Sequence, residues 1–232
     1  MILWIFLCYF IHFTFAYKSL ALKPGGLKGF YMMGITKYIK SNYDLENWHF
    51  YGSSAGAWNS LYLSCKKDEL FLQHARELEQ FSYLNLYDLQ CTMKKRILSN
   101  FVIDDFNINQ LHICVSKKRN YIPFPLFRKN IINEFYDLED ILECSIASSH
   151  LPYVSNGKFY YNYRGNKCVD GGFFLNPYND FVSPTFIIEP DMWNNQKTNK
   201  MNKIHNMNIK GLLFEGYNDA YKNRNELDHY FL

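Results

Sequence analysis

Short runs of bulky apolar residues alternate along the chain with longer segments in which apolar residues recur at helical spacing. The runs that predict β-strands cover residues 17–22, 48–51, 111–115, 166–169, 185–188 and 211–216. The segments that predict helices cover residues 30–40, the stretch after residue 54, and residues 68–81, 137–147 and 219–231. Strand followed by helix, repeated in this way, predicts an α/β fold with a mostly parallel sheet, in which ligands bind at the carboxyl ends of the strands.

Three stretches are less regular. Residues 85–109 hold many apolar and aromatic residues without a clear period, which predicts a surface loop or, alternatively, a flap over a binding pocket. Residues 121–127 contain Pro123 and Pro125 and therefore predict an edge strand or an extended loop. Residues 193–208 are rich in Asn and Lys and predict a polar loop. No internal repeat or Pro/Ser-rich linker is present, so we expect residues 17–232 to form one domain.

Residues 1–16 are almost wholly apolar or aromatic, and His12 is the only one of them that ionises near neutral pH. Thr14 and Ala16 are small residues at positions that suit a signal peptidase, but no Lys or Arg precedes the apolar run. The run is also slightly shorter than the roughly 20 residues that span a bilayer. We expect a signal peptide or a membrane-proximal segment, with a core strand or helix of the domain as the alternative. The protein is accordingly expected to be secreted or membrane-associated.

Composition and charge narrow the classes of function. The 232 residues are 48% hydrophobic, which supports a sizeable core, and the formal net charge of +3 is too small to indicate nucleic-acid binding. Basic clusters at residues 94–96 and 117–119 indicate solvated surface, with contact to an anionic membrane as the alternative. The six cysteines have neither C-x-x-C pairing nor metal-ligand spacing, so we expect free thiols and no metal site.

The strongest chemical signal is the pentapeptide Gly52-Ser53-Ser54-Ala55-Gly56, which fits G-x-S-x-G. The aromatic run before it suits a buried strand, and the alanines and leucines after it suit a helix. A serine on so sharp a turn presents its hydroxyl away from the backbone, and Gly52 and Gly56 let the chain bend. Ser54 is therefore the candidate nucleophile, and the alternative is a Gly/Ser-rich turn that only begins a helix.

A glycine-rich loop joins the first predicted strand to the first predicted helix. Its sequence, Lys23-Pro24-Gly25-Gly26-Leu27-Lys28-Gly29, fits neither G-x-x-x-x-G-K-[ST] nor G-x-G-x-x-G, so nucleotide binding is not indicated. Such a loop exposes backbone N–H groups at a helix N-terminus and attracts negative charge. Ahead of a G-x-S-x-G turn, Gly25, Gly26, Lys28 and Gly29 suit an oxyanion hole, and the alternative is a plain strand-to-helix turn.

A second catalytic group is suggested by Asp170, which follows the predicted strand at residues 166–169 and precedes Gly171 and Gly172. A carboxylate at the end of this strand can lie at the same edge of the sheet as Ser54. Asp170 is therefore a candidate general base for Ser54. The alternative is an ordinary Asp-Gly turn, which is common in proteins.

Together, the three motifs resemble those of the patatin-like phospholipases. That family has the motifs G-G-G-x-[KR]-G, G-x-S-x-G and D-G-[GA] in the order found here at residues 25–29, 52–56 and 170–172, and residues 147–152 are also similar. The resemblance covers about residues 18–176 and implies a three-layer α/β/α patatin-like fold with a mostly parallel central sheet. One departure is Pro24, which stands where the family usually has its first glycine and has no N–H to donate.

The resemblance also implies a mechanism. It implies a Ser54–Asp170 dyad without histidine, a phospholipid or acylglycerol substrate, peripheral contact with a membrane, and no cofactor or metal. The residues alone leave open a Ser-Asp-His triad, because His205 and His229 follow Asp170 and because His49 and His150 lie near the motifs. A second alternative, motivated by Pro24, is a lipid-binding protein that has kept the fold and lost turnover.

Overall fold

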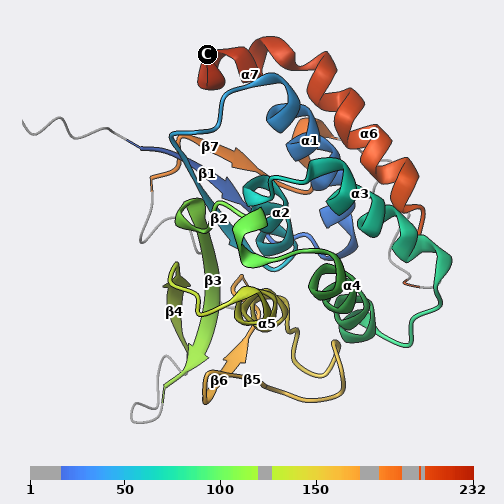
Figure 1. Ribbon diagram of the computed structural model, residues 1–232, viewed down its shortest axis with the longest axis vertical. Helices are drawn as coiled ribbons and strands as arrows, with labels where there is room; N and C mark the ends of the chain where they lie inside the picture. The colour runs from blue at the N-terminus through green and yellow to red at the C-terminus, as the bar shows by residue number, and fades with distance from the viewer. Residues whose placement is uncertain (1–16, 120–126, 173–182, 195–203, 205–206) are drawn as a thin grey trace, which may run out of the picture.

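A computed structural model describes residues 17–119, 127–172, 183–194, 204 and 207–232 (Figure 1). The strands are β1 (Lys18–Leu22), β2 (Trp48–Ser53), β3 (Leu111–Lys118), β4 (Phe127–Ile132), β5 (Tyr161–Tyr163), β6 (Asn166–Val169) and β7 (Phe186–Ile188). The α-helices are α1 (Gly29–Asn42), α2 (Ala55–Ser64), α3 (Asp68–Glu77), α4 (Leu86–Asn100), α5 (Leu138–Ser148), α6 (Ile209–Lys222) and α7 (Arg224–Phe231). Short 3-10 helices are η1 (Gly26–Lys28), η2 (Leu78–Gln80), η3 (Ile103–Asp105), η4 (Ile108–Gln110) and η5 (Met192–Asn194).

The seven described strands form one sheet, in the order β5-β6-β3-β2-β1-β7, with β4 also paired to β3. The central strands β3, β2, β1 and β7 are parallel to one another, while β4 and β6 run antiparallel to β3. Helices α2 and α5 lie against the sheet, and α3 and α4 lie further out (Figure 1). The predicted α/β class, with a mostly parallel central sheet flanked by helices, is confirmed.

The register of the sheet brings the three motifs of the sequence to one place. Leu22, the last residue of β1, pairs with Gly52, and Ser53, the last residue of β2, pairs with Cys114 of β3. Strand β6 comes from the other direction, and its last residue, Val169, pairs with Ser116. Because β6 is antiparallel to β3, the chain after Val169 runs back toward the level of Cys114, and so toward the end of β2.

One face of the sheet is apolar and carries the core. Side chains alternate between the two faces of a strand, and the inward set is buried on every central strand. Each such leucine, isoleucine or phenylalanine contributes about 1.5–3 kcal/mol relative to an exposed position. The inward residues are Leu20, Leu22, Trp48, Phe50, Leu111, Ile113, Val115, Phe186 and Ile188. Because these side chains are buried together, the core holds the strands in register and so fixes where their carboxyl ends lie relative to one another.

Most of the predicted elements are confirmed. The predicted strands at 17–22, 48–51, 111–115, 166–169 and 185–188 correspond to β1, β2, β3, β6 and β7, and the predicted helices at 30–40, 68–81 and 137–147 correspond to α1, α3 with η2, and α5. The segment 1–16, the prolines at 123 and 125, and most of 193–208 lie outside the described residues. Cys65, Cys91, Cys114, Cys144 and Cys168 are free thiols. No helix of the described chain has the length and apolar character of a membrane span.

The prediction of a strand at residues 211–216 is wrong, because these residues belong to α6. Gly34 of α1 and Gly216 of α6 let the two helices touch. A Cβ atom on Gly34 would lie 2.2 Å from the Leu213 carbonyl oxygen, and one on Gly216 would lie 1.9 Å from the Tyr31 carbonyl oxygen. A short apolar run between glycines looks like a buried strand. Only the contact with α1 shows that Gly216 serves helix packing, while Gly211 lies against Asn208, the residue that caps α6. The predicted closing helix at 219–231 is divided at Asn223 into the end of α6 and α7.

The prediction that residues 85–109 form a loop is also wrong, because they contain the fifteen-residue helix α4. Asn85 caps this helix by accepting a hydrogen bond from the Asp88 N–H at 2.9 Å. Leu89, Met93 and Ile97 form its buried stripe at four-residue spacing. Both the cap and the apolar stripe are present in the sequence, but the aromatic and charged residues between them obscure the helical period of the apolar positions.

Candidate active site

Ser54 lies on the turn between β2 and α2 in a strained backbone conformation. Its φ of 56° and ψ of −124° are rare for a residue with a side chain, and such a conformation costs about 1–3 kcal/mol. The glycines on both sides are required by close backbone contacts. A Cβ atom on Gly52 would lie 2.3 Å from the Gly56 carbonyl oxygen, and one on Gly56 would lie 1.9 Å from the Leu22 carbonyl oxygen. The elbow is therefore clamped between the end of β1 and the first turn of α2.

The backbone of the elbow is held from outside by Ser148, at the end of α5. The Ser54 N–H donates to the Ser148 hydroxyl at 2.9 Å, and that hydroxyl donates to the Cys114 carbonyl at 2.6 Å. The Ser148 carbonyl in turn accepts from the Gly171 N–H at 3.0 Å. One residue thus connects the elbow, strand β3 and the segment that carries Asp170.

Asp170 is buried beside Ser54, with 2% of its surface exposed. Its N–H donates to the His150 carbonyl at 2.8 Å, and its Oδ1 accepts from the Gly172 N–H at 2.8 Å. Burial raises the pKa of its carboxyl, the hydrogen bonds from the Ser54 hydroxyl and the Gly172 N–H lower it, and the resulting pKa is about 6. The carboxylate is therefore a stronger base than an exposed aspartate and is in contact with the hydroxyl that it would deprotonate.

The glycine loop after β1 borders the same site. Gly26 has a φ of 53°, which glycine adopts without strain, and its backbone lines a cavity together with Ser54. Within the described part of the chain, the N–H groups of Gly25 and Gly26 donate to no acceptor. Lys28 donates its backbone N–H to the Gly25 carbonyl at 3.0 Å, and its side chain bonds to Asp191 at 2.5 Å. These contacts fix the loop and leave two amides available to a ligand.

The two ends of this loop pack against the other two motifs. A Cβ atom on Gly29 would lie 2.7 Å from the Ala55 Cβ, so the start of α1 touches the start of α2. A Cβ atom on Gly172 would lie 2.1 Å from the Pro24 Cγ. Pro24, the departure from the expected glycine, therefore fits because residue 172 has no side chain. Its ring connects the glycine loop to the segment of Asp170.

A largely apolar cavity opens at Ser54. The space between its walls, with the open mouth included, is about 610 Å³. The wall is formed by helices α1 to α4 and η2, with Leu27 and Gly26 at the loop side. Its larger apolar residues are Phe30, Met33, Trp58, Phe71, Leu89 and Met93. A long hydrocarbon chain attached to a carbonyl at Ser54 is the kind of ligand that such a wall would desolvate.

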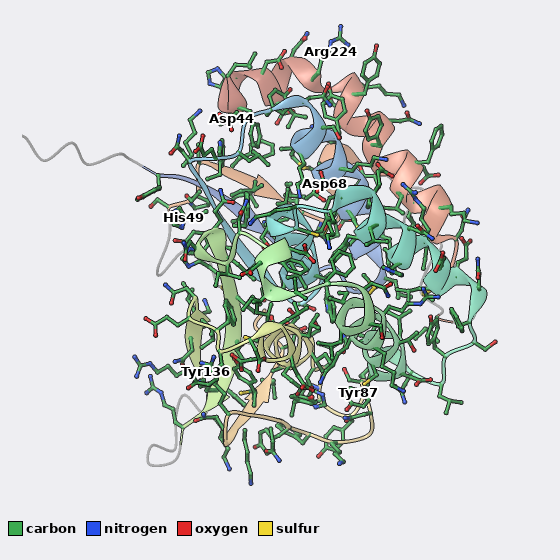
Figure 2. The ribbon with its side chains drawn as sticks, viewed as in Figure 1. Asp44, His49, Asp68, Tyr87, Tyr136 and Arg224 are labelled. Atoms are coloured by element: carbon green, nitrogen blue, oxygen red, sulfur yellow. The ribbon has the colours of Figure 1, made fainter. Side chains whose placement is uncertain are left out.

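None of the described histidines has its imidazole ring hydrogen-bonded to Ser54 or Asp170. The Nδ1 of His49 faces the Nε2 of His112 at 2.7 Å near the start of β2, and the His49 side chain is labelled at that end of the sheet in Figure 2. His150 is buried, and its Nε2 lies 3.1 Å from the Lys158 carbonyl. His229 is exposed on α7, which packs on Trp48 at the opposite end of β2 from the elbow. His205 lies outside the described residues.

The sequence predictions missed the contact of Ser148 with the elbow, although the segment 147–152 that contains it was noted as similar to the family.

We expect Ser148→Ala to lower kcat about ten- to hundredfold with little change in KM, because the buried Ser54 N–H loses its acceptor and the nucleophile shifts. The measurement is steady-state hydrolysis of a soluble ester.

The matched control for Ser148 is Ser145→Ala, one turn earlier on α5. Ser145 is equally buried, but its hydroxyl donates at 3.0 Å to the Ile141 carbonyl of its own helix. Equal losses of kcat in the two variants would mean that α5 as a whole, rather than the contact with the elbow, supports activity.

Comparison with known protein families gives a match over most of the chain. A family model described as patatin-like phospholipase matches residues 20–182, which is well over half of the chain and includes the glycine loop, the elbow and Asp170. No curated protein matches the chain.

Proposed function

The chain belongs to the patatin-like phospholipase family, and we propose on this basis that it hydrolyses acyl esters of lipids with Ser54 as nucleophile and Asp170 as general base. Membership supports an ester hydrolase that acts on lipids. The observation that carries the finer assignment is that the Ser54 hydroxyl lies beside the buried Asp170 carboxylate, close enough to lower its pKa, at the mouth of an apolar cavity. A nucleophile and its base in contact are the minimum set for acyl transfer.

The proposed reaction has two halves. Asp170 takes the proton of the Ser54 hydroxyl as the oxygen attacks the ester carbonyl, and the same carboxyl then gives that proton to the departing alcohol, which leaves an acyl group on Ser54. Water attacks the acyl group, Asp170 takes the water's proton and returns it to the Ser54 oxygen, and a fatty acid is released. The proton count is restored at the end of each turnover.

The charge on the carbonyl oxygen is stabilised, in this proposal, by backbone amides. The N–H groups of Gly25 and Gly26 have no other acceptor in the described chain and border the cavity that Ser54 lines. The N–H of Ala55, the first residue of α2, adds a donor at a helix N-terminus. Removing one such donor typically costs about 10²–10³-fold in kcat.

Pro24 does not remove this oxyanion hole. The missing N–H at position 24 matters only if that amide is a donor, whereas the proposed donors are at positions 25 and 26. The packing of the Pro24 ring on Gly172 supports a structural role for the proline. We therefore favour an active enzyme over a lipid-binding relative that has lost turnover.

Labelling by a fluorophosphonate probe tests this choice, together with hydrolysis of phosphatidylcholine and of acylglycerols. An activated Ser54 is expected to react with the probe, and a protein that binds lipid but neither reacts nor hydrolyses would be the inactive relative. Loss of both activities on replacing His205 or His229 by alanine would instead indicate a Ser-Asp-His triad. The lipid panel also decides between phospholipids and acylglycerols as the preferred substrate.

The pH dependence of hydrolysis follows from the pKa of Asp170. The general base must be ionised, and its pKa is about 6, so kcat/KM for a soluble, non-titrating ester is expected to be constant above about pH 7 and to fall about tenfold per pH unit below about pH 6. A pH–rate profile measures this, with circular dichroism at each pH to confirm that the protein stays folded. A profile that remains flat down to about pH 4, the usual range of an exposed aspartate, would contradict the buried base.

A further inference from the structure

A second hollow lies outside the cavity that holds Ser54. It contains about 990 Å³, including open solvent, and Gly26, Leu27 and Leu86 line both spaces. The outer hollow is also lined by Leu84, Leu151 and Val154, from the loop before α4 and the loop after α5. Apolar residues therefore continue from the wall of the inner cavity to the surface of the protein.

Three large apolar side chains of these two loops project into solvent, and two of them, Leu84 and Val154, line the outer hollow. Leu84 is 87% exposed, and the neighbouring residues Tyr153 and Val154 are each 66% exposed. A single exposed apolar residue is ordinary, but several around one opening mark a surface that is covered in use. We call Leu84, Tyr153 and Val154 the apolar rim.

The backbone holds the rim residues in these exposed positions. On one side, the Leu84 N–H donates to the Asp88 carboxylate at 3.3 Å. On the other side, the Tyr153 N–H donates to the Lys158 carbonyl at 2.9 Å, and Tyr153 has the unusual φ of 62°. The N–H of Tyr87 bonds to the Ser155 carbonyl at 3.3 Å and ties the two loops together, and Tyr87 is labelled at this corner of the molecule in Figure 2.

The described lining of the outer hollow carries little charge. Among the described residues that line the outer hollow, Lys28 is the only charged one, and its ammonium group is bonded to the Asp191 carboxylate. The described lining therefore offers a partner mainly apolar area, and its one charge is paired. Among the described residues, the lining has no unpaired cation that would attract an acidic surface.

We propose that the apolar rim inserts into the surface of a zwitterionic phospholipid layer, so that one lipid passes along Leu27 and Leu86 to Ser54. This inference rests on the proposed function, because the layer that the rim enters is the one that contains the lipid substrate. The continuity between the rim and the inner cavity argues for a lipid layer rather than a protein partner. A lipid that leaves the layer through this opening keeps its hydrocarbon chain in contact with apolar side chains and out of water.

The test compares two readouts in one set of variants: binding to phosphatidylcholine vesicles by co-sedimentation, and the ratio of vesicle hydrolysis to soluble-ester hydrolysis. For Leu84→Asp and Val154→Asp, vesicle binding and this ratio are each expected to fall about tenfold or more, because a carboxylate resists transfer into the layer. Val102→Asp is the matched control, since Val102 is 61% exposed outside the rim. Raising the salt concentration is expected to leave vesicle binding unchanged.

A gain-of-binding variant covers the case in which an aspartate variant fails to fold. Val154→Trp is expected to raise vesicle binding severalfold, because tryptophan favours the membrane interface, and Val102→Trp is not. The proposal that the rim inserts into a lipid layer would be overturned by either of two results. One is an equal change in vesicle binding for the variants at residues 154 and 102, and the other is binding that needs anionic lipid and is lost in salt. Rim-dependent binding without any ester hydrolysis would instead refute the proposed function and leave the rim intact.

Discussion

Replacing Ser54 by alanine is expected to abolish ester hydrolysis, with kcat lowered by about 10⁴-fold or more. The variant has no atom that can form the acyl-enzyme, so only water held near the amides of Gly25 and Gly26 could react. Hydrolysis of a soluble ester and of phosphatidylcholine would be measured, together with labelling by a fluorophosphonate probe. Labelling is expected to vanish with hydrolysis, because both need the same activated oxygen.

The neighbouring serine provides the matched control for this experiment. Ser53 is fully buried, and its hydroxyl has no hydrogen-bond partner in the described part of the chain. Ser53→Ala is therefore expected to keep both labelling and turnover. A Ser54→Ala protein that is folded and still hydrolyses esters at the rate of the wild type would remove Ser54 from the mechanism. If Ser53→Ala lost labelling and Ser54→Ala kept it, the nucleophile would be Ser53 and the assignment of Ser54 would be wrong.

The elements near the site were predictable because their signals are local. Gly52, Ser54 and Gly56 lie within one turn, so a pentapeptide carries the whole geometry of the elbow. The same is true of Asp170, whose strand and following glycines are adjacent to it in the chain. What the sequence did not reveal is the direction of β6. The antiparallel pairing of β6 with β3, which returns the chain to the level of the elbow, depends on residues more than 50 positions earlier in the chain, since Val169 pairs with Ser116.

The elements that were missed depend on contacts between distant segments. Gly216 belongs to a helix because Gly34 of α1 lies opposite to it, and nothing near residue 216 reports that partner. Ser148 is one of several serines in its segment, and its importance comes from the Ser54 N–H, 94 residues earlier. The loops of the apolar rim are joined by the hydrogen bond from the Tyr87 N–H to the Ser155 carbonyl, 68 residues later. Residues that act through a distant backbone atom leave no periodic or motif signal.

Asp170→Asn is expected to lower kcat by about 10³-fold or more and, at the same time, to stabilise the protein. The loss of rate follows because an amide cannot take the proton of the Ser54 hydroxyl. The gain in stability follows from burial. The pKa of Asp170 is about 6 when folded, above the value of about 3.9 for an unfolded aspartate, so the fold disfavours the ionised form. The asparagine oxygen can still accept the hydrogen bond from the Gly172 N–H.

The pH dependence of this stabilisation gives the prediction its sign. Below about pH 4 the carboxyl is protonated in both folded and unfolded chains, and the wild type carries no penalty. As the pH rises from about 4 to about 6 the unfolded chain ionises first, and above about pH 6 the penalty is complete, at roughly 2–3 kcal/mol. The Tm of Asp170→Asn should therefore exceed that of the wild type at about pH 7, and the difference should disappear at about pH 4.

Asp140 supplies the contrasting control, because its pKa is shifted in the opposite direction. Burial alone would raise the pKa of Asp140, but the hydrogen bonds from the Arg164 guanidinium and the Tyr136 N–H bring it below its ordinary value. Asp140→Asn should therefore lower the Tm at about pH 7, with the loss shrinking in acid. If the Tm gain of Asp170→Asn were equal at about pH 7 and about pH 4, the ionised carboxylate would not be the source of the stability penalty. The two opposite signs would mean that the fold maintains Asp170 as a base against its own stability, which a purely structural Asp-Gly turn has no reason to do.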